Sequence, residues 1–167
     1  MEDFEAFVRA RSAALLRTAY LLTGDAHRAE DVVQETLIRA ADRWSRITPD
    51  PEPYVRRILY TRAVDGWRQR RVRDAAAVRL PVPRDASTSP AETVAPRLVL
   101  REALLRLTTR QRAVLVLRYY DDLTEQQTAA VLGCSVNTVK SQARHALARL
   151  RVLAPELLAD LDPMETT

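Results

Sequence analysis

The chain has 167 residues and a formal net charge of +4 at pH 7, and 47% of its residues are hydrophobic. This length suits one ordinary domain or two small ones, and this composition excludes a wholly disordered chain. Three scattered glycines, Gly24, Gly66 and Gly133, exclude a glycine-rich phosphate loop, and the single cysteine, Cys134, excludes an internal disulfide.

Ala, Leu and Arg dominate the sequence and strand-like alternation is absent, so we predict an all-α fold. One cysteine and two distant histidines, His27 and His145, predict neither a metal site nor a cofactor. No apolar stretch approaches eighteen residues and the first residues are acidic. We therefore expect no membrane span and no signal peptide, and a cytoplasmic protein.

The N-terminal part is predicted to form three helices, over about 3–22, 26–44 and 53–73. Gly24 favours a left-handed turn after the first helix, and Asp25 is placed to cap the second. The residues on the expected core stripes of the first two helices are Phe4, Phe7, Val8, Leu15, Ala19, Leu22, Ala29, Val32, Val33, Thr36, Leu37, Ala40 and Trp44.

The face of the second helix that lies opposite this core carries Asp31, Gln34, Glu35 and Ile38. These residues follow one another at near-helical spacing, so they form one strip. An exposed apolar residue among acids is typical of a surface that docks on another protein.

The third predicted helix is strongly basic, because residues 54–73 hold seven arginines and one acid, Asp65. Tyr54, Tyr60 and Trp67 are interleaved with these arginines. Aromatic rings stack on unpaired bases, which stabilises a complex by roughly 1–3 kcal/mol per base. The combination indicates binding to single-stranded or melted DNA. The alternative is that Tyr60 and Trp67 belong to the core and the arginines form a solvated face.

A proline-rich segment, residues 75–97, shows no sustained apolar period and is predicted to be a flexible linker. Such a coil spans roughly 25–30 Å, comparable to one turn of DNA at about 35 Å, so two tethered modules could contact two segments of one duplex. Helices are then expected over about 98–107, 109–120, 124–132 and from 135 onward, followed by an acidic tail over 154–167 that we expect to be disordered.

A short break, Gly133-Cys134-Ser135, separates the last two of these helices. Thr124 and Gln127 form a capping-box pattern before the first of the two, and Ser135 is placed to cap the second. Two helices joined by so short a glycine-containing turn are typical of a helix-turn-helix DNA-binding motif.

The last helix has one apolar face and an opposite face that bears no acid. That opposite face carries Asn137, Thr138, Lys140, Ser141, Arg144 and His145. Side chains of these kinds donate hydrogen bonds to base edges and phosphates, so we predict that this helix reads DNA sequence. The alternative is a solvated helical hairpin.

The chain resembles bacterial sigma factors of the extracytoplasmic-function (group 4) type along nearly its whole length. The segment "AEDVVQETLIRA" is similar to the family's polymerase-binding helix, and "YVRRILYTRAVDGWR" to its promoter-melting helix. The segment from Leu100 to Arg151 is similar to its domain for the −35 promoter element. "YVRR" and "NTVKS" also resemble the SigE-like subgroup of actinobacteria.

The resemblance implies a sigma region 2 domain over residues 1–74 and a sigma region 4 domain over 98–153. It implies that the chain binds promoter DNA and core RNA polymerase, at the coiled coil of the largest subunit and at the flap, and it allows for an anti-sigma partner. The residues it assigns to polymerase are Asp31, Gln34, Glu35 and Ile38. Those assigned to the −10 element are Tyr54, Arg57, Tyr60, Thr61, Asp65, Arg68, Arg70 and Arg71, and those assigned to the −35 element are Asn137, Thr138, Lys140, Ser141, Arg144 and His145.

Departures from the family pattern concern the DNA contacts. Thr61 stands where relatives commonly have Asn, Asn137 where Gly is frequent, and Gln127 where Glu is usual.

Two other classes of protein are the alternatives to a sigma factor. A stand-alone helix-turn-helix regulator would have a sensing domain, which has no reason to carry the arginine-aromatic helix. An enzyme would need a carboxylate cluster, a metal set or a phosphate loop, so we expect no catalysis and no small-molecule substrate.

Overall fold

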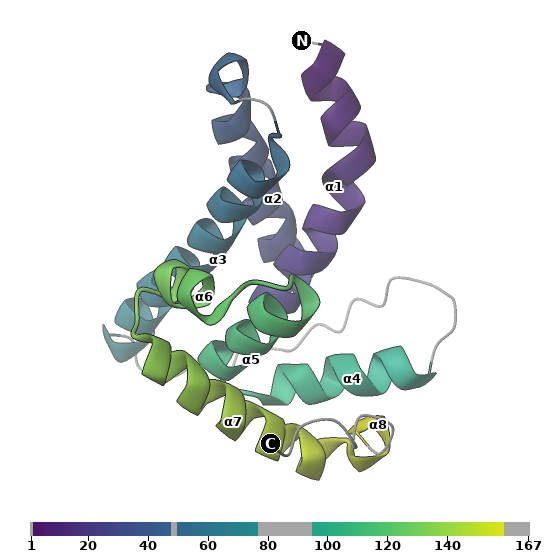
Figure 1. Cartoon of the computed structure of the whole chain (residues 1–167), viewed down its shortest axis with the longest axis vertical. Coiled ribbons are helices and arrows are strands. Elements are labelled where there is room, and N and C mark those ends of the chain that lie inside the picture. The colour runs from purple at the N-terminus through teal and green to yellow at the C-terminus, as the bar shows by residue number, and fades with distance from the viewer. Residues whose placement is uncertain (1, 48–49, 77–94, 159–167) are drawn as a thin grey trace. The chain divides into compact units, whose positions relative to one another are not determined.

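The computed structural model describes residues 2–47, 50–76 and 95–158. All regular structure in these ranges is helical and none of it is strand, which confirms the all-α prediction. The helices divide into two compact units, α1 to α3 and α4 to α8 (Figure 1). Each unit is described separately below.

The first unit is a bundle of three helices, α1 (Glu2–Thr23), α2 (Ala26–Ala41) and α3 (Glu52–Ala76), which pack against one another. Gly24 adopts a left-handed φ of 71°, as predicted. The Asp25 carboxylate caps α2 by accepting a hydrogen bond from the backbone N–H of the third residue on, at 2.9 Å.

The core of this bundle consists of one stripe from each helix. The buried apolar residues are Leu15, Ala19, Leu22, Ala29, Val33, Ala40, Val55, Leu59, Tyr60, Ala63, Val64 and Trp67. Trp44, predicted to lie in the core, is only half-buried. The reason is that α2 ends at Ala41, so Trp44 lies in a separate 3₁₀ turn, η1 (Trp44–Arg46). Its ring packs at one end of the bundle against Phe4 and Phe7, with centroids 4.9 and 5.1 Å away.

The second unit contains α4 (Ala95–Arg106), α5 (Thr109–Leu115), a π-helical turn η2 (Val116–Tyr120), α6 (Glu125–Leu132), α7 (Val136–Leu153) and α8 (Pro155–Leu158). Its core is formed mainly where α5 and α6 pack against α7. The buried side chains there include Val114, Leu117, Leu132, Val139 and Leu150.

The helix predicted over 109–120 is not uniform. It is α-helical to Leu115 and then widens into the π turn η2, where the Asp121 N–H donates to the Val116 carbonyl at 2.9 Å. Asp122 follows with a left-handed φ of 54°, which redirects the chain toward α6.

Parts of the predicted linker and of the predicted tail are helical. Helix α3 continues to Ala76 and α4 begins at Ala95, so both ends of the predicted linker are helical, while 77–94 lie outside the described residues. The start of the acidic tail forms the short helix α8, which corrects the expectation of disorder there; residues 159–167 lie outside the described residues.

Candidate nucleic-acid and protein interfaces

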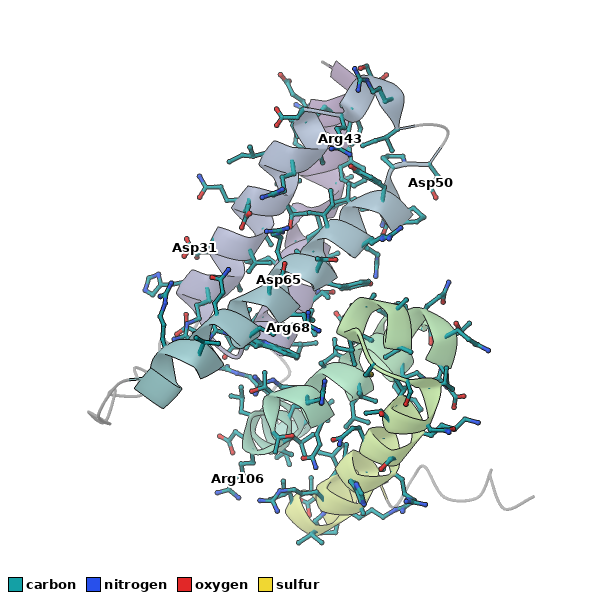
Figure 2. All side chains as sticks on the ribbon, turned by 90° about the vertical axis from the view of Figure 1, so that its left-hand side faces the viewer. Asp31, Arg43, Asp50, Asp65, Arg68 and Arg106 are labelled. Carbon is teal, nitrogen blue, oxygen red and sulfur yellow. The ribbon has the colours of Figure 1, made fainter. Side chains whose placement is uncertain are left out.

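The outer face of α2 presents an acidic strip with one apolar residue. Asp31, Gln34, Glu35 and Ile38 are all exposed, and Ile38 keeps 57% of its accessible surface. The opposite face of α2 is buried in the bundle, so this strip has the orientation that the sequence predicted. Figure 2 shows Asp31 on α2, with Asp65 and Arg68 on the neighbouring helix α3. We call Asp31, Gln34, Glu35 and Ile38 the docking strip.

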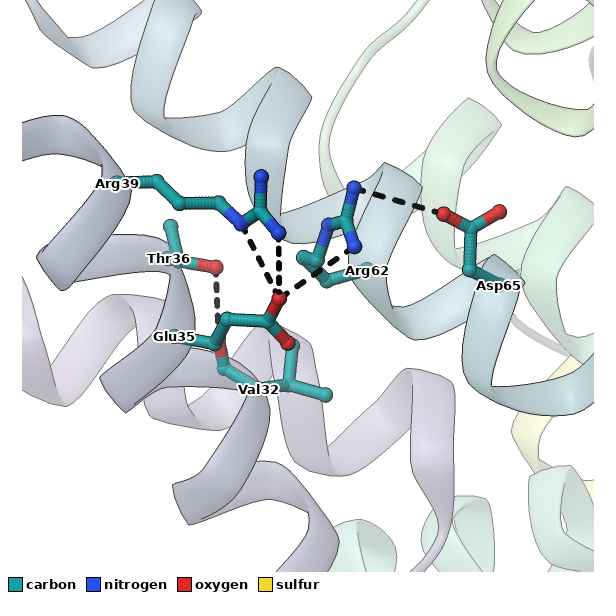
Figure 3. A network of polar contacts seen from close by, with 6 residues as sticks. All are labelled: Val32, Glu35, Thr36, Arg39, Arg62 and Asp65. Carbon is teal, nitrogen blue, oxygen red and sulfur yellow. Dashed lines mark hydrogen bonds and ion pairs between the residues drawn. The ribbon is translucent and has the colours of Figure 1, made fainter. Parts of the chain in front are cut away.

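The docking strip is connected to α3 by an ion pair, which belongs to a small network of charged side chains (Figure 3). One Glu35 carboxylate oxygen lies 3.1 Å from Arg39 on the next turn of α2 and 3.4 Å from Arg62 on α3. The Arg62 guanidinium also lies 3.7 Å from Asp65. Arg62 therefore links an acid predicted to contact polymerase with an acid predicted to contact the −10 element. Sequence reasoning did not single out Arg62, because only the packing of α2 against α3 brings it to Glu35.

The aromatic residues of α3 divide between its two faces. Tyr60 and Trp67 are buried, with 3% and 9% of their surface exposed, whereas Tyr54 is half-exposed. A ring that is packed in the bundle has no face on which a base can stack. For Tyr60 and Trp67 the structure therefore favours the core alternative, and only Tyr54 of the three offers an accessible ring.

The polar side of α3 carries the remaining predicted −10 residues. Arg57 and Arg68 are exposed, and Asp65 and Arg70 are partly exposed. The Thr61 hydroxyl donates to the Arg57 carbonyl at 2.8 Å, one turn earlier on the helix. The structure does not describe the side chain of Arg71. Helix α3 thus presents arginines over several turns and buries the aromatic residues on its other side.

The helix-turn-helix geometry of the second unit agrees with the predicted caps. Thr124 and Gln127 form the complete capping box of α6, with hydrogen bonds of 2.8 and 3.1 Å. Gly133 ends α6 with a φ of 62°, and the Ser135 hydroxyl accepts the N–H of Thr138 at 3.1 Å to begin α7. These local contacts fix the angle at which α7 leaves the turn.

The face of α7 opposite its buried stripe is accessible to solvent. Asn137, Lys140, Arg144 and His145 are exposed, and Thr138 and Ser141 are partly exposed. We call these six residues the reading face. The Thr138 hydroxyl lies 2.9 Å from that of Ser135, so this member also takes part in capping the helix.

A shallow groove of about 270 Å³ runs along one edge of the reading face. We call it the α7 groove, and its lining residues are Arg118, Tyr119, Glu125, Val139, Lys140, Ala143, Arg144, Leu147 and Arg151. The Arg118 guanidinium lies 5.8 Å from the centre of the Tyr119 ring, and 57% of Tyr119 is exposed.

Sequence reasoning missed four of the lining residues that carry polar groups, Arg118, Tyr119, Glu125 and Arg151. Arg151 follows Arg144 at a spacing of seven and could have been found from helical periodicity. Arg118 and Tyr119 come from the π turn, and no local pattern placed them beside α7.

Two classes of site are not found in the described part of the chain. No group of three or more His, Cys, Asp or Glu residues gathers there in a way that could hold a metal ion. Among those same residues, no helix has the length and apolar character that crossing a membrane requires.

Both units match known families. Residues 7–73 match the family described as sigma-70 region 2, and residues 97–150 match sigma-70 region 4. The chain is 40% identical over 164 residues to the RNA polymerase sigma-E factor of Streptomyces coelicolor, covering 96% of this chain and 89% of that protein. It is 36% identical over 152 residues to the ECF RNA polymerase sigma factor SigL of Mycobacterium tuberculosis, covering 87% and 85% of the two chains.

Solved structures agree with these matches. The sigma factor RpoE of Bartonella quintana, crystallised with the anti-sigma factor NepR, superposes with a TM-score of 0.70 at 25% identity, over 93% of this chain and 99% of that one. CnrH, solved in complex with the cytosolic domain of CnrY, superposes with a TM-score of 0.55 at 23% identity, over 96% and 89%, which shows a shared fold.

The region 2 match accounts for the arginine-aromatic helix of the first unit, which the alternative of a stand-alone regulator left unexplained. The region 4 match covers the helix-turn-helix of the second unit. The chain therefore belongs to the sigma-70 family, in its extracytoplasmic-function group, whose members bind core RNA polymerase and direct it to promoters.

Proposed function

We propose that the chain performs promoter selection through three separate surfaces. The docking strip of α2 binds the coiled coil of the polymerase largest subunit. The basic side of α3 binds the −10 element and assists its melting, and the reading face of α7 binds the −35 element while the second unit rests against the polymerase flap. The boundaries we propose are a region 2 domain over 1–74, a linker over 75–97 and a region 4 domain over 98–153.

One observation carries this proposal: in the described part of the chain, α3 and α7 each present a basic surface, and they belong to two different compact units. Helix α3 bears arginines on the side that the bundle leaves open, and α7 bears cations and amides opposite its buried stripe. Cationic side chains bind the phosphate backbone, and donors on a helix in the major groove read base edges. A chain with two such helices is suited to contact one promoter at two places, and a single contact would leave one of the helices without a role.

Capture of unpaired −10 bases is assigned to the accessible part of α3. Tyr54 supplies a half-exposed ring, and Arg57 and Arg68 supply charge for the strand backbone. Thr61 stands where relatives commonly have Asn. Its hydroxyl is already bonded to the helix backbone, which supports a −10 preference that differs from theirs. The burial of Tyr60 in this structure argues against a direct stacking role for that residue.

The proposed role involves no bond chemistry by this chain, which positions DNA while polymerase forms the phosphodiester bonds. The chain acts in the cytoplasm, because polymerase and promoter DNA are located there. We also propose an anti-sigma partner, because the RpoE relative of Bartonella quintana was crystallised with one. A partner that covers the docking strip would prevent polymerase binding.

The test is run-off transcription from a library of genomic fragments, with purified core polymerase and the full chain. We expect transcripts from a limited set of start sites that share two upstream elements, and co-elution of the chain with polymerase in gel filtration. Core polymerase alone is the control. Failure to co-elute, or an unchanged set of start sites, would disprove the proposed function.

A further inference from the structure

The α7 groove contains one carboxylate among four cationic side chains. Glu125, on the first turn of α6, places a carboxylate oxygen 3.6 Å from the Lys140 ammonium of the reading face. Arg118, Arg144 and Arg151 line the same groove. Glu125 keeps about a third of its side-chain surface exposed and lines the groove.

Helix capping does not account for this carboxylate. The first turn of α6 is already satisfied by the complete capping box of Thr124 and Gln127. A negative charge at a helix N-terminus is favourable, but the effect is small at an exposed position. The more informative feature is its partner, because Lys140 is one of the cations predicted to contact the −35 element.

A carboxylate at this position has two effects on DNA binding. It repels phosphate, with an energy on the order of 1 kcal/mol at 4 Å in water, which weakens contact with duplex of any sequence. It also restrains Lys140, whose long side chain would otherwise reach many positions. When the Lys140 ammonium is held beside α6, it is less able to bind the nearest phosphate. It then binds DNA mainly by donating a hydrogen bond to an acceptor on a base edge.

We propose that Glu125 is a positioning residue for sequence selectivity, which acts through Lys140 by suppressing backbone binding that is independent of sequence. This inference rests on the proposed function of α7. It adds a residue from α6 to the determinants of promoter choice, and it explains the presence of an acid in an otherwise cationic groove.

The experiment compares the full chain with its Glu125→Gln variant, which keeps the side-chain length and removes the charge. Fluorescence anisotropy gives the Kd for two duplexes across a range of salt concentrations. One duplex carries the upstream element found in the run-off experiment, and the other carries the same bases in scrambled order. Glu102→Gln is the matched control, because Glu102 is exposed on α4 and does not line the groove.

We expect Glu125→Gln to tighten binding to the scrambled duplex about fivefold, the factor that corresponds to the repulsion above. Binding to the specific duplex should tighten less, so the ratio of the two Kd values falls. The salt dependence for scrambled DNA should steepen by about one unit in log–log slope, because Lys140 gains a phosphate. In a Lys140→Gln background the same substitution should no longer steepen the slope. The melting temperature should fall by no more than a few degrees, because the substitution removes a favourable charge from the first turn of α6 but leaves the capping box.

Equal tightening for both duplexes, or no change beyond that of Glu102→Gln, would overturn the positioning role while leaving the proposed function intact. A wild-type chain that does not distinguish the duplexes in this assay or at promoters would instead overturn the proposed function, and this inference with it.

Discussion

Tyr54 and Tyr60 have the same chemistry and lie six residues apart on one helix, but the structure gives them different environments. Tyr54 is half-exposed, whereas Tyr60 is 3% exposed and packs in the three-helix bundle. Interleaving of aromatic residues with arginines therefore does not show which rings face solvent and which lie in the core. The spacing of Tyr60, Ala63 and Trp67 is that of a buried stripe, and this signal separates Tyr60 from the surface set.

We predict that Tyr60→Ala lowers the free energy of unfolding of the first unit by about 3 kcal/mol, because it leaves a cavity in a packed core. Tyr54→Ala should cost clearly less, but should slow promoter opening while sparing the closed complex. Urea unfolding followed by tryptophan fluorescence measures the first unit selectively, since both tryptophans, Trp44 and Trp67, lie in it. Equal destabilisation by the two substitutions would show that Tyr54 is also a core residue.

Three helix starts, those of α2, α6 and α7, could be predicted from the sequence because their causes are local. A cap needs one side chain and a backbone N–H two or three residues away, and Asp25, Thr124 and Ser135 all form the predicted bonds. The π turn η2 and the Arg62 network could not be predicted in this way. The first depends on how α5 packs against α7, and the second on how α2 packs against α3.

At the turn of the helix-turn-helix motif, we predict that Gly133→Ala destabilises the second unit by about 1 kcal/mol. The cause is the left-handed φ of 62°, which a β-carbon disfavours. Gly133→Asn is the control and should be closer to wild type, because Asn tolerates this conformation. The measurement is urea unfolding followed by circular dichroism. The second unit has no tryptophan, so its unfolding is the transition that circular dichroism detects and tryptophan fluorescence does not. Equal stability of all three proteins would contradict the assignment of strain to this position.

Across the whole molecule, the surfaces proposed to bind polymerase and the two promoter elements are divided between the two units. The docking strip and the basic side of α3 belong to the first unit, and the reading face belongs to the second. Tethering raises the effective concentration for the second DNA contact, so weak individual contacts are sufficient. Loss of polymerase binding and loss of upstream sequence preference should therefore be separable by substitution.

For the first unit, we predict that Asp31→Arg combined with Gln34→Ala weakens polymerase binding about tenfold or more, because it reverses a charge within the docking strip. The fold should be intact by tryptophan fluorescence. Glu30→Arg is the control, since Glu30 is exposed on α2 beside the docking strip and undergoes the same change of charge. Gel filtration with core polymerase provides the measurement. Equal loss in both variants would indicate a general electrostatic effect and would exclude a specific strip.

For the second unit, we predict that Arg144→Ala relaxes the upstream sequence preference and leaves co-elution with polymerase unchanged. Loss of a bidentate contact to a guanine costs roughly 1–3 kcal/mol at the base pair concerned and little elsewhere. The control is Arg149→Ala, because Arg149 is exposed further along α7 and is not one of the six residues of the reading face. Transcription from promoters that differ at single upstream base pairs measures the preference. If Arg144→Ala instead weakens all of these promoters by one common factor, Arg144 binds phosphate, and the reading of bases must lie with Asn137 and Lys140.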